Sequence, residues 1–428
     1  MKTLFSPLIL ILISLSGIYL TAAAQERYLP LNRNYTLAYE AALYRTDTNA
    51  HTAFRPFLSS VVNKYTDLDS CLSPFKREGK FYDRWIGRKL FSEHLLEVKH
   101  EDYTLFADPL FEFRITSWSE NTKELYYINT RGIHAGGSLG KGFSFYTSFY
   151  ESQGYFPGYM DSLIRAMRIV PGGGRIKRFY SSAFDYSIAS GYISYSLPKY
   201  FNFQFGHDKV FIGDGYRSLL LSDHPFNYPF MKINTSFWKI NYTNLYTVMQ
   251  DMKIPVPEEE SFIKKYASVH YLSVNLTNRL SVGLMEAIIW KSDSVRNRSI
   301  DINYLNPVIF LRPVEFSLNS PDNALMGINI RYTLFTNHVL YGQAMLDEFK
   351  LNEVKAGNGW WANKQAFQIG YKTFDLFKVR GFNFLTEFNY VRPYTYQHKS
   401  TLTAYSHNNT PLAHPLGANF YEWLPDES

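Results

Sequence analysis

From about Thr104 onward, apolar and polar residues alternate along the chain. In segment 201–206 phenylalanine occupies every second position, and Asn202, Gln204 and Gly206 stand between. Segments 272–277, 367–372 and 382–390 repeat this period of two. Successive side chains of a strand point to opposite faces of a sheet, so each segment predicts a strand with one apolar, aromatic-rich face and one polar face.

Thirteen segments are predicted as strands, and the connections between them alternate in length. The strands are expected near 105–115, 124–135, 142–151, 183–196, 199–208, 232–240, 242–250, 267–276, 280–290, 327–335, 338–346, 364–373 and 380–391. Short turns at one rim and long loops at the other are typical of an antiparallel barrel that spans the outer membrane. A soluble β-sandwich has no reason to keep this alternation.

The composition agrees with a membrane β-barrel and excludes other classes. The 428 residues include 34 Tyr, 34 Phe and 7 Trp, and only 19% are charged. So many apolar side chains exclude intrinsic disorder. The net charge of +6 is too small and too scattered to indicate a nucleic-acid partner.

The first 24 residues have the pattern of a secretory signal peptide. Lys2 precedes an apolar stretch from Leu4 to Leu20, and three alanines at 22–24 offer a cleavage site before Gln25. The alternative is an uncleaved membrane anchor. Beyond residue 24, no stretch reaches the roughly 18 consecutive apolar residues of a spanning helix. The single cysteine, Cys71, allows no internal disulfide. We therefore expect an exported protein of the Gram-negative outer membrane.

Residues 25–103 differ from the rest, because segments 50–65 and 83–98 carry helical spacing. We predict a small periplasmic helical segment there, with a loop and edge strands as the alternative, and a barrel over residues 104–428. Thirteen strands is an odd number, whereas single-chain bacterial barrels have even ones. The tail from Pro393 has no strongly alternating segment. The barrel is thus expected to be incomplete at its C-terminal end, unless one strand has been miscounted.

The most distinctive stretch lies between residues 200 and 230. It places an acid, an arginine fork and an aromatic ring in one short loop, which suits hydrogen bonds to sugar hydroxyls and packing on sugar rings. The candidate polysaccharide-binding residues are Asp208, Asp214, Tyr216, Arg217 and Asp223. The alternative is that Asp214 and Arg217 form a structural ion pair that plugs the barrel.

Other chemistry finds little support in the sequence. The adjacent acids at 347–348 and 258–260 are typical of solvated loops, and the histidines lack the spacing of a zinc site. No G-x-S-x-G motif or phosphate-binding loop occurs. We therefore expect no enzyme, no catalytic residue, no metal and no cofactor. Segment 161–170 is predicted as a short helix that covers the barrel mouth, with anion contacts through Arg165 and Arg168 as the alternative.

Three blocks of sequence resemble the capsule assembly Wzi family, including its gliding-motility RemB-like members. They are FDYSIASGYISYSLPKY at 184–200, FNFQFGHDKVFIGDGYRSLLLSD at 201–223 and PLAHPLGANF at 411–420. The resemblance implies an outer-membrane β-barrel of eighteen strands with a small periplasmic helical bundle. It also implies a lectin role in attaching or organising capsular or other surface polysaccharide. Members of the family usually continue with further strands beyond the third block.

These observations lead to one main functional expectation and two alternatives. The main one is a monomeric barrel that binds surface or capsular polysaccharide, in contact with outer-membrane lipid and assembled by the barrel-assembly machinery. The first alternative is a porin-like channel for sugars or anions, suggested by polar residues on the face opposite the aromatic one. The second is an outer-membrane hydrolase. The glycan, and the choice between capsule and motility, stay open.

Overall fold

The computed structural model describes residues 26–72, 79–118, 121–179, 182–254, 261–292, 300–307, 310–317, 322–347 and 364–417. The predicted signal peptide lies outside these residues. Among them, no helix has both the length and the apolar character needed to cross a membrane.

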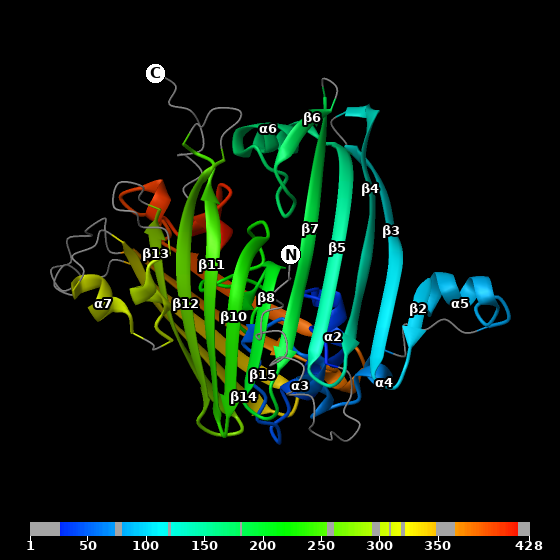
Figure 1. The fold of residues 1–428 in the computed structure, drawn as a ribbon, viewed down its shortest axis with the longest axis horizontal. Helices are drawn as coiled ribbons and strands as arrows, with labels where there is room; N and C mark the ends of the chain where they lie inside the picture. The colour runs from blue at the N-terminus through cyan, green and yellow to red at the C-terminus, as the bar shows by residue number, and fades with distance from the viewer. Residues whose placement is uncertain are drawn as a thin grey trace, which may run out of the picture.

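A single large antiparallel sheet of 15 strands forms most of the molecule and curves into a barrel wall (Figure 1). Almost every strand pairs with its neighbours along the chain, which gives an up-and-down order. The strands are β2 (Leu96–Lys99), β3 (Tyr103–Trp118), β4 (Asn121–Leu139), β5 (Phe143–Tyr155), β6 (Ile176–Phe179), β7 (Ala183–Ser196), β8 (Phe201–Asp208), β10 (Tyr228–Phe237), β11 (Ile240–Asp251), β12 (Ile263–Asn275), β13 (Leu280–Lys291), β14 (Asn323–Phe335), β15 (His338–Asp347), β16 (Lys364–Thr373) and β17 (Phe384–Val391). All thirteen predicted strands are present.

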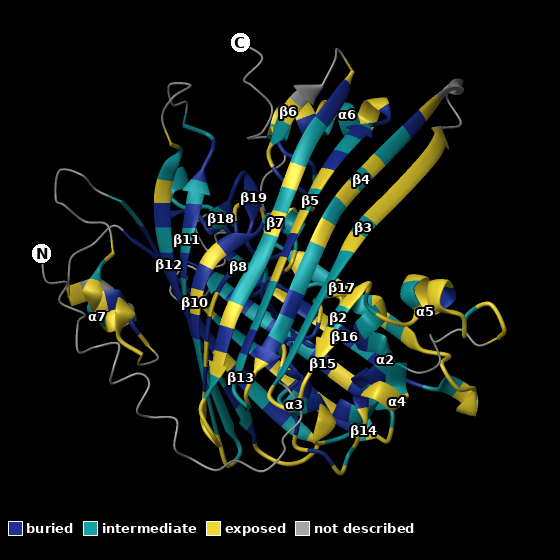
Figure 2. Cartoon of the chain, turned by 45° about the vertical axis from the view of Figure 1, so that its right-hand side comes forward, coloured by how far each residue is buried: buried dark blue, intermediate teal, exposed yellow. Residues whose placement is uncertain are grey.

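The wall is inside out compared with a soluble protein. In β8 the side chains of Phe201, Phe203 and Phe205 are 37–62% exposed, whereas Asn202 and Gln204 are 4% exposed. Exposed positions alternate with half-buried ones along β17, and bands of different exposure alternate along β4, β5 and β7 in Figure 2, whereas β3 is exposed from 111 to 117. Such a continuous apolar outer face is stable only against lipid, and a β-sheet crosses lipid only as a barrel wall. The fold is therefore that of an outer-membrane β-barrel.

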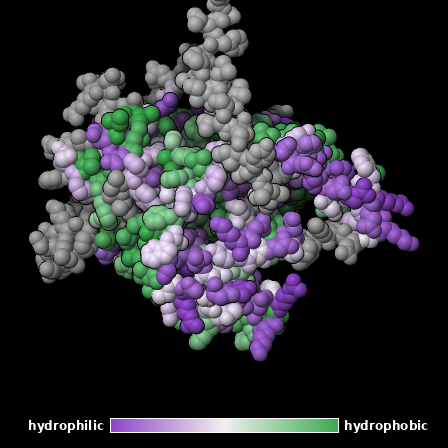
Figure 3. Space-filling model, turned by 60° about the horizontal axis from the view of Figure 1, so that its bottom comes forward, coloured by the Kyte–Doolittle hydropathy of each residue, from purple (hydrophilic) through white to green (hydrophobic). Residues whose placement is uncertain are grey.

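Aromatic residues mark the short-turn rim of this wall. Trp238 in the β10–β11 turn, Phe335 at the end of β14 and Phe377 in the β16–β17 turn are 81%, 69% and 82% exposed. Aromatic girdles of this kind lie at the boundary between the hydrocarbon layer and water. Viewed toward this end, hydrophilic and hydrophobic side chains separate into distinct areas (Figure 3).

The N-terminal segment lies on the concave side of the wall. Its helices α2 (Arg33–Leu43), α3 (Ser59–Asn63) and α4 (Leu68–Leu72) pack around a buried cluster that also takes in Val339 of β15 and Phe374. Strand β1 (Phe54–Arg55) pairs with β9 (Phe211–Ile212), which belongs to the long loop between β8 and β10. The placement of this segment on the periplasmic side stays a prediction.

The helical predictions for this region agree with the structure only in part. Segment 50–65 contains α3 but also the extended β1, and segment 83–98 contains α5 (Trp85–Phe91) and then β2. Helix α2 was not predicted, because its buried face carries Thr36 and Glu40 beside Tyr39 and Leu43. Those two polar residues hide an otherwise regular helical spacing.

The two ends of the sheet are β2 and β17, which are not neighbours in the described strand order. After β17, residues 392–417 form an irregular segment with the 3-10 helices η4 (Thr401–Thr403) and η5 (Pro415–Gly417) and the two-residue strands β18 (Ser406–His407) and β19 (Thr410–Pro411). The eighteen strands implied by the resemblance, and the incomplete barrel, stay predictions.

The exposed apolar face predicts that a charge introduced on it lowers the free energy of unfolding by an amount that depends on its depth in the membrane. Ile369 lies mid-strand in β16 and is 63% exposed. We expect Ile369→Arg to lower the free energy of unfolding by about 2–4 kcal/mol, because a guanidinium would enter the hydrocarbon layer, whereas the rim substitution Phe377→Arg should cost about 0–1 kcal/mol. Urea unfolding in phospholipid vesicles measures both. Equal costs would contradict the membrane-spanning assignment.

Candidate functional site

The loop that joins β8 to β10 runs through the barrel interior and carries Asp214, which is 2% exposed. Its Oδ1 accepts hydrogen bonds from the hydroxyls of Tyr44 (2.7 Å) and Thr52 (2.5 Å), both in the N-terminal segment. Its Oδ2 accepts one from Nδ2 of Asn329 in β14 (2.9 Å). One carboxylate thus joins the N-terminal segment, the loop and the wall.

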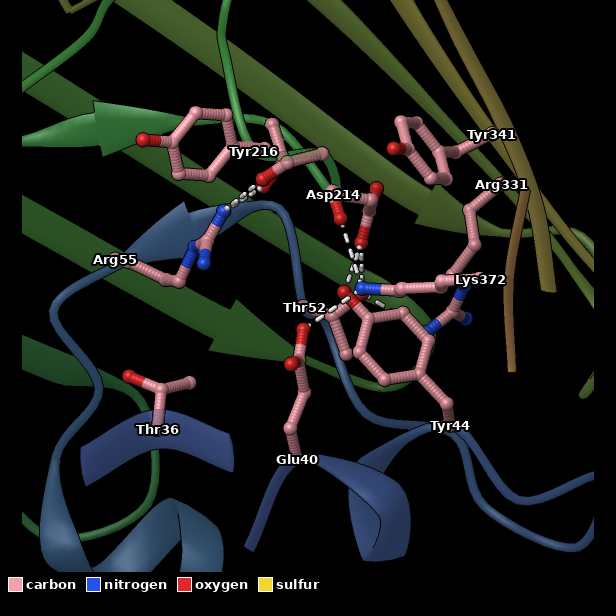
Figure 4. Close-up of polar contacts among 12 residues, drawn as sticks. Thr36, Glu40, Tyr44, Thr52, Arg55, Asp214, Tyr216, Arg331, Tyr341 and Lys372 are labelled. Carbon is pink, nitrogen blue, oxygen red and sulfur yellow. Dashed lines mark hydrogen bonds and ion pairs between the residues drawn. The ribbon is translucent and has the colours of Figure 1, made fainter. Parts of the chain in front are cut away.

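Two buried bases of the wall surround this carboxylate (Figure 4). Lys372 Nζ of β16 donates to the backbone oxygen of Asp214 and to Glu40 Oε1 of α2, both at 2.7 Å. It also lies 3.6 Å from the centre of the Tyr44 ring. Arg331 Nη1 of β14 donates to Ala50 O (3.1 Å) and Thr52 Oγ1 (3.0 Å). The interior network is defined as Glu40, Tyr44, Thr52, Asp214, Asn329, Arg331 and Lys372.

The charges of this interior network compensate one another. Burial by itself would raise the pKa of the Asp214 carboxyl, but Arg331, Lys372 and the hydrogen bonds from Thr52 and Asn329 outweigh it and hold that pKa below its ordinary value. Burial likewise raises the pKa of Glu40, and Lys372 with Arg55 more than reverses this. Both carboxylates are therefore ionised at neutral pH, which is how a buried charge is tolerated.

Arg217, the predicted ion-pair partner of Asp214, takes a different position among the described residues. Its guanidinium lies 4.9 Å from the centre of the Tyr216 ring, and that of Arg33 lies 5.1 Å from the same ring. The backbone N–H groups of Tyr216 (2.9 Å) and Arg217 (3.2 Å) donate to the carboxylate of Glu387 in β17. The buried role suggested for Asp214 fits the structure, but the charges that stabilise its carboxylate are those of Arg331 and Lys372.

Asp208 and Asp223 lie apart from the interior network, around Lys209. Asp208 Oδ1 accepts from Lys209 N (2.8 Å), and Lys209 Nζ donates to Gly172 O (3.4 Å) in the long loop after β5. Burial lowers the pKa of the Lys209 amine, while the charges of Asp223 and Asp208 oppose that shift. The five candidates thus form two groups. Asp214 is buried in the interior network, and Tyr216 (51% exposed) and Arg217 (half-buried) follow it in the loop; the charges of Asp208 and Asp223 act on Lys209. Asp223 is exposed.

The irregular segment 392–417 covers the loop from above. The hydroxyls of Tyr396 and Tyr405 donate to the backbone oxygens of Leu219 (3.0 Å) and Leu220 (2.8 Å). Ser222 Oγ donates to Ala413 O (2.7 Å), and Ser222 N to Leu412 O (2.8 Å). Two of the blocks that carry the family resemblance, 201–223 and 411–420, are therefore in contact through their described residues.

Lysines of the wall hold this covering segment, and sequence reasoning missed them. Lys265 Nζ of β12 donates to Thr401 O (3.0 Å), Ala404 O (3.0 Å) and Ser406 Oγ (2.9 Å). Lys364 Nζ of β16 donates to Gln397 O. The only signal in the sequence was a lysine on the polar face of an alternating strand, and this does not predict which residues the lysine contacts.

The helix predicted over 161–170 is present as α6 (Gly158–Met167). Its Ile164 is fully buried against Phe156, Val170 and Phe184, and Arg165 pairs with Asp161 (2.6 Å). These contacts favour the packing role over the anion-binding one. Within the described ranges no group of His, Cys, Asp and Glu side chains could hold a metal ion.

Comparison with known proteins adds little to this description. No family model and no curated protein matches the chain. Three crystal structures that match in part are Acinetobacter baumannii OccAB2 (9% identity, TM-score 0.30), Pseudomonas aeruginosa OccK11 (9%, 0.30) and P. aeruginosa OpdQ (10%, 0.27). The match covers 67% of this chain in each case and 80%, 78% and 80% of theirs. TM-scores this low carry no argument, and the fold assignment rests on the strand pairing and burial described above.

The interior network predicts that Asp214→Asn destabilises the protein. The substitution keeps the shape but leaves Arg331 and Lys372 with Glu40 as the one remaining carboxylate of the network. We expect a loss of about 3 kcal/mol in the free energy of unfolding, as for other broken buried ion pairs. The exposed Asp223→Asn should change it by less than about 0.5 kcal/mol. Urea unfolding in vesicles compares the two, and similar values for both would show that Asp214 is not central.

Proposed function

We propose that this chain is a surface-polysaccharide-binding barrel of the Wzi type, which binds or organises capsular or related glycans at the cell exterior. The observation that carries the proposal is the filled interior. The N-terminal segment, the loop 209–227 and the segment 392–417 all lie on the concave side and hydrogen-bond to the wall and to one another. A wall filled by its own chain is suited to hold loops in place for binding.

The polar contacts within the interior divide the candidate residues by role. Asp214 has its carboxylate oxygens occupied by Tyr44, Thr52 and Asn329. It therefore positions the loop and has little capacity left for a ligand. Asp223 is exposed and its charge acts on the Lys209 amine, so a carboxylate and an ammonium are both available in this part of the loop to bond sugar hydroxyls. We assign glycan contact to the group of Asp208, Lys209 and Asp223.

Binding of surface polysaccharide to the full chain in vesicles tests this assignment. The probe is the polysaccharide purified from the bacterium that encodes the chain. We expect Asp223→Ala to weaken binding roughly tenfold, since a charge-assisted hydrogen bond contributes about 1.5 kcal/mol. Glu101→Ala, which changes an exposed acid in the β2–β3 turn, is the control and should leave binding unchanged. Equal binding by all three proteins would refute the assignment.

A porin-like channel for sugars or anions is the second candidate, and the basic interior favours it. Lys232, Lys265, Arg331 and Lys372 all point to the concave side and are at most 3% exposed. Conductance in planar lipid bilayers separates the two functions. The filled interior predicts that the barrels conduct no ions. A steady ion current through the wild-type protein would therefore favour the channel and count against the binding role.

A further inference from the structure

A short segment outside the wall leaves most of its apolar side chains uncovered. Residues 79–98 comprise a turn, helix α5 and strand β2, and Figures 1 and 2 show α5 beyond β3 at the edge of the sheet. Trp85, Ile86 and Leu90 of α5 are 57–66% exposed. Phe81, Phe91, Leu95, Leu96 and Val98 are exposed as well. The proposed function leaves this surface unused.

The uncovered surface continues the lipid-facing side of the wall. Strand β2 pairs with β3 so that Leu96 lies opposite Ala107 and Val98 opposite Leu105. These odd-numbered positions of β3 belong to the same face as Pro109, which lies opposite the 55% exposed Ile133 of β4, whereas Ser138, opposite Thr104 on the other face, is 3% exposed. Leu96 and Val98 therefore face lipid, and α5 lies shortly before them along the chain.

The segment is tied to the wall and carries an excess of positive charge. The Asp108 carboxylate of β3 accepts from Leu95 N and contacts His94 Nδ1, both at 2.5 Å. Residues 79–98 hold four bases, Lys80, Arg84, Arg88 and Lys89, and three acids, Asp83, Glu93 and Glu97, which gives a net charge of +1 with His94 neutral. Arg88 (2.8 Å) and Lys89 (3.3 Å) both pair with Glu93. Because Glu93 pairs with Arg88 and Lys89, their partial burial in a lipid interface costs less free energy. The other two bases, Lys80 and Arg84, suit anionic headgroups.

We propose that residues 79–98 form an interfacial anchor that binds lipid on the short-turn side of the membrane. The apolar side chains of α5 lie among the upper parts of the acyl chains, and the bases contact lipid phosphates. Trp and basic residues are the side chains that prefer this interface. Lipid is the occupant because the surface continues a lipid-facing strand. The inference rests on the membrane location of the barrel in the proposed function, and not on glycan binding.

Spin labels on the full chain test the anchor. With Cys71→Ser removing the single cysteine, a label is placed through Leu90→Cys in α5. Phe113→Cys in the wall serves as the lipid reference, and Tyr159→Cys, exposed in α6, as the water reference. The protein is refolded into vesicles of three parts phosphatidylethanolamine to one part phosphatidylglycerol. Accessibility to oxygen, which dissolves in lipid, is compared with accessibility to a water-soluble nickel chelate.

We expect the label at 90 to resemble the lipid reference, with a severalfold higher ratio of oxygen to nickel accessibility than the label at 159. A label at 90 that resembles the one at 159, with the label at 113 in lipid, would overturn the anchor and leave the barrel intact. A label at 90 shielded from both reagents would overturn it in favour of a protein contact. If the label at 113 also behaved as in water, the membrane location itself would be refuted.

Discussion

A buried carboxylate between buried bases is the constraint on which the interior depends. The inward faces of β14 and β16 carry Arg331 and Lys372, each at most 3% exposed. Charges in that position cost several kcal/mol each unless opposite charges lie nearby and hydrogen bonds satisfy their polar groups. Asp214 comes from a loop and Glu40 from the N-terminal helix, so neither segment can leave without exposing the bases of the wall.

This constraint follows from the two environments that the wall separates. Outside, lipid takes the aromatic and aliphatic side chains, and every second position is therefore polar and points inward. Inside, the polar groups need partners, and three segments of the chain supply many of them. Apolar side chains of the loop, such as Leu219, Leu220 and Leu221, pack with Tyr396 and Tyr405 above them in one buried cluster. The interior is thus a packed core with a polar lining.

The sequence predicts the wall well because the wall depends on a local pattern. All thirteen strands follow from a period of two, which each segment shows by itself. The interior could not be predicted to the same extent. Asp214 stood out by its neighbours in sequence, but its partners Tyr44, Asn329 and Lys372 are 115 or more residues away along the chain. Helix α2 escaped detection for a related reason: Glu40 on its buried face is explained only by Lys372 on a distant strand.

The same contacts decide how readily the interior could open. A water-filled path along the wall requires the loop 209–227 to move away from Asn329 and Lys372, together with the N-terminal segment that β1 and β9 join to it. The hydrogen bonds of Asp214 to Tyr44, Thr52 and Asn329 and that of Lys372 to the Asp214 backbone would then be lost together. A ligand could open the barrel only by binding the open form more tightly than the filled one. In the proposed function the glycan contacts Asp223 at the loop surface, where the interior segments do not have to move; this is the structural reason for proposing binding rather than transport.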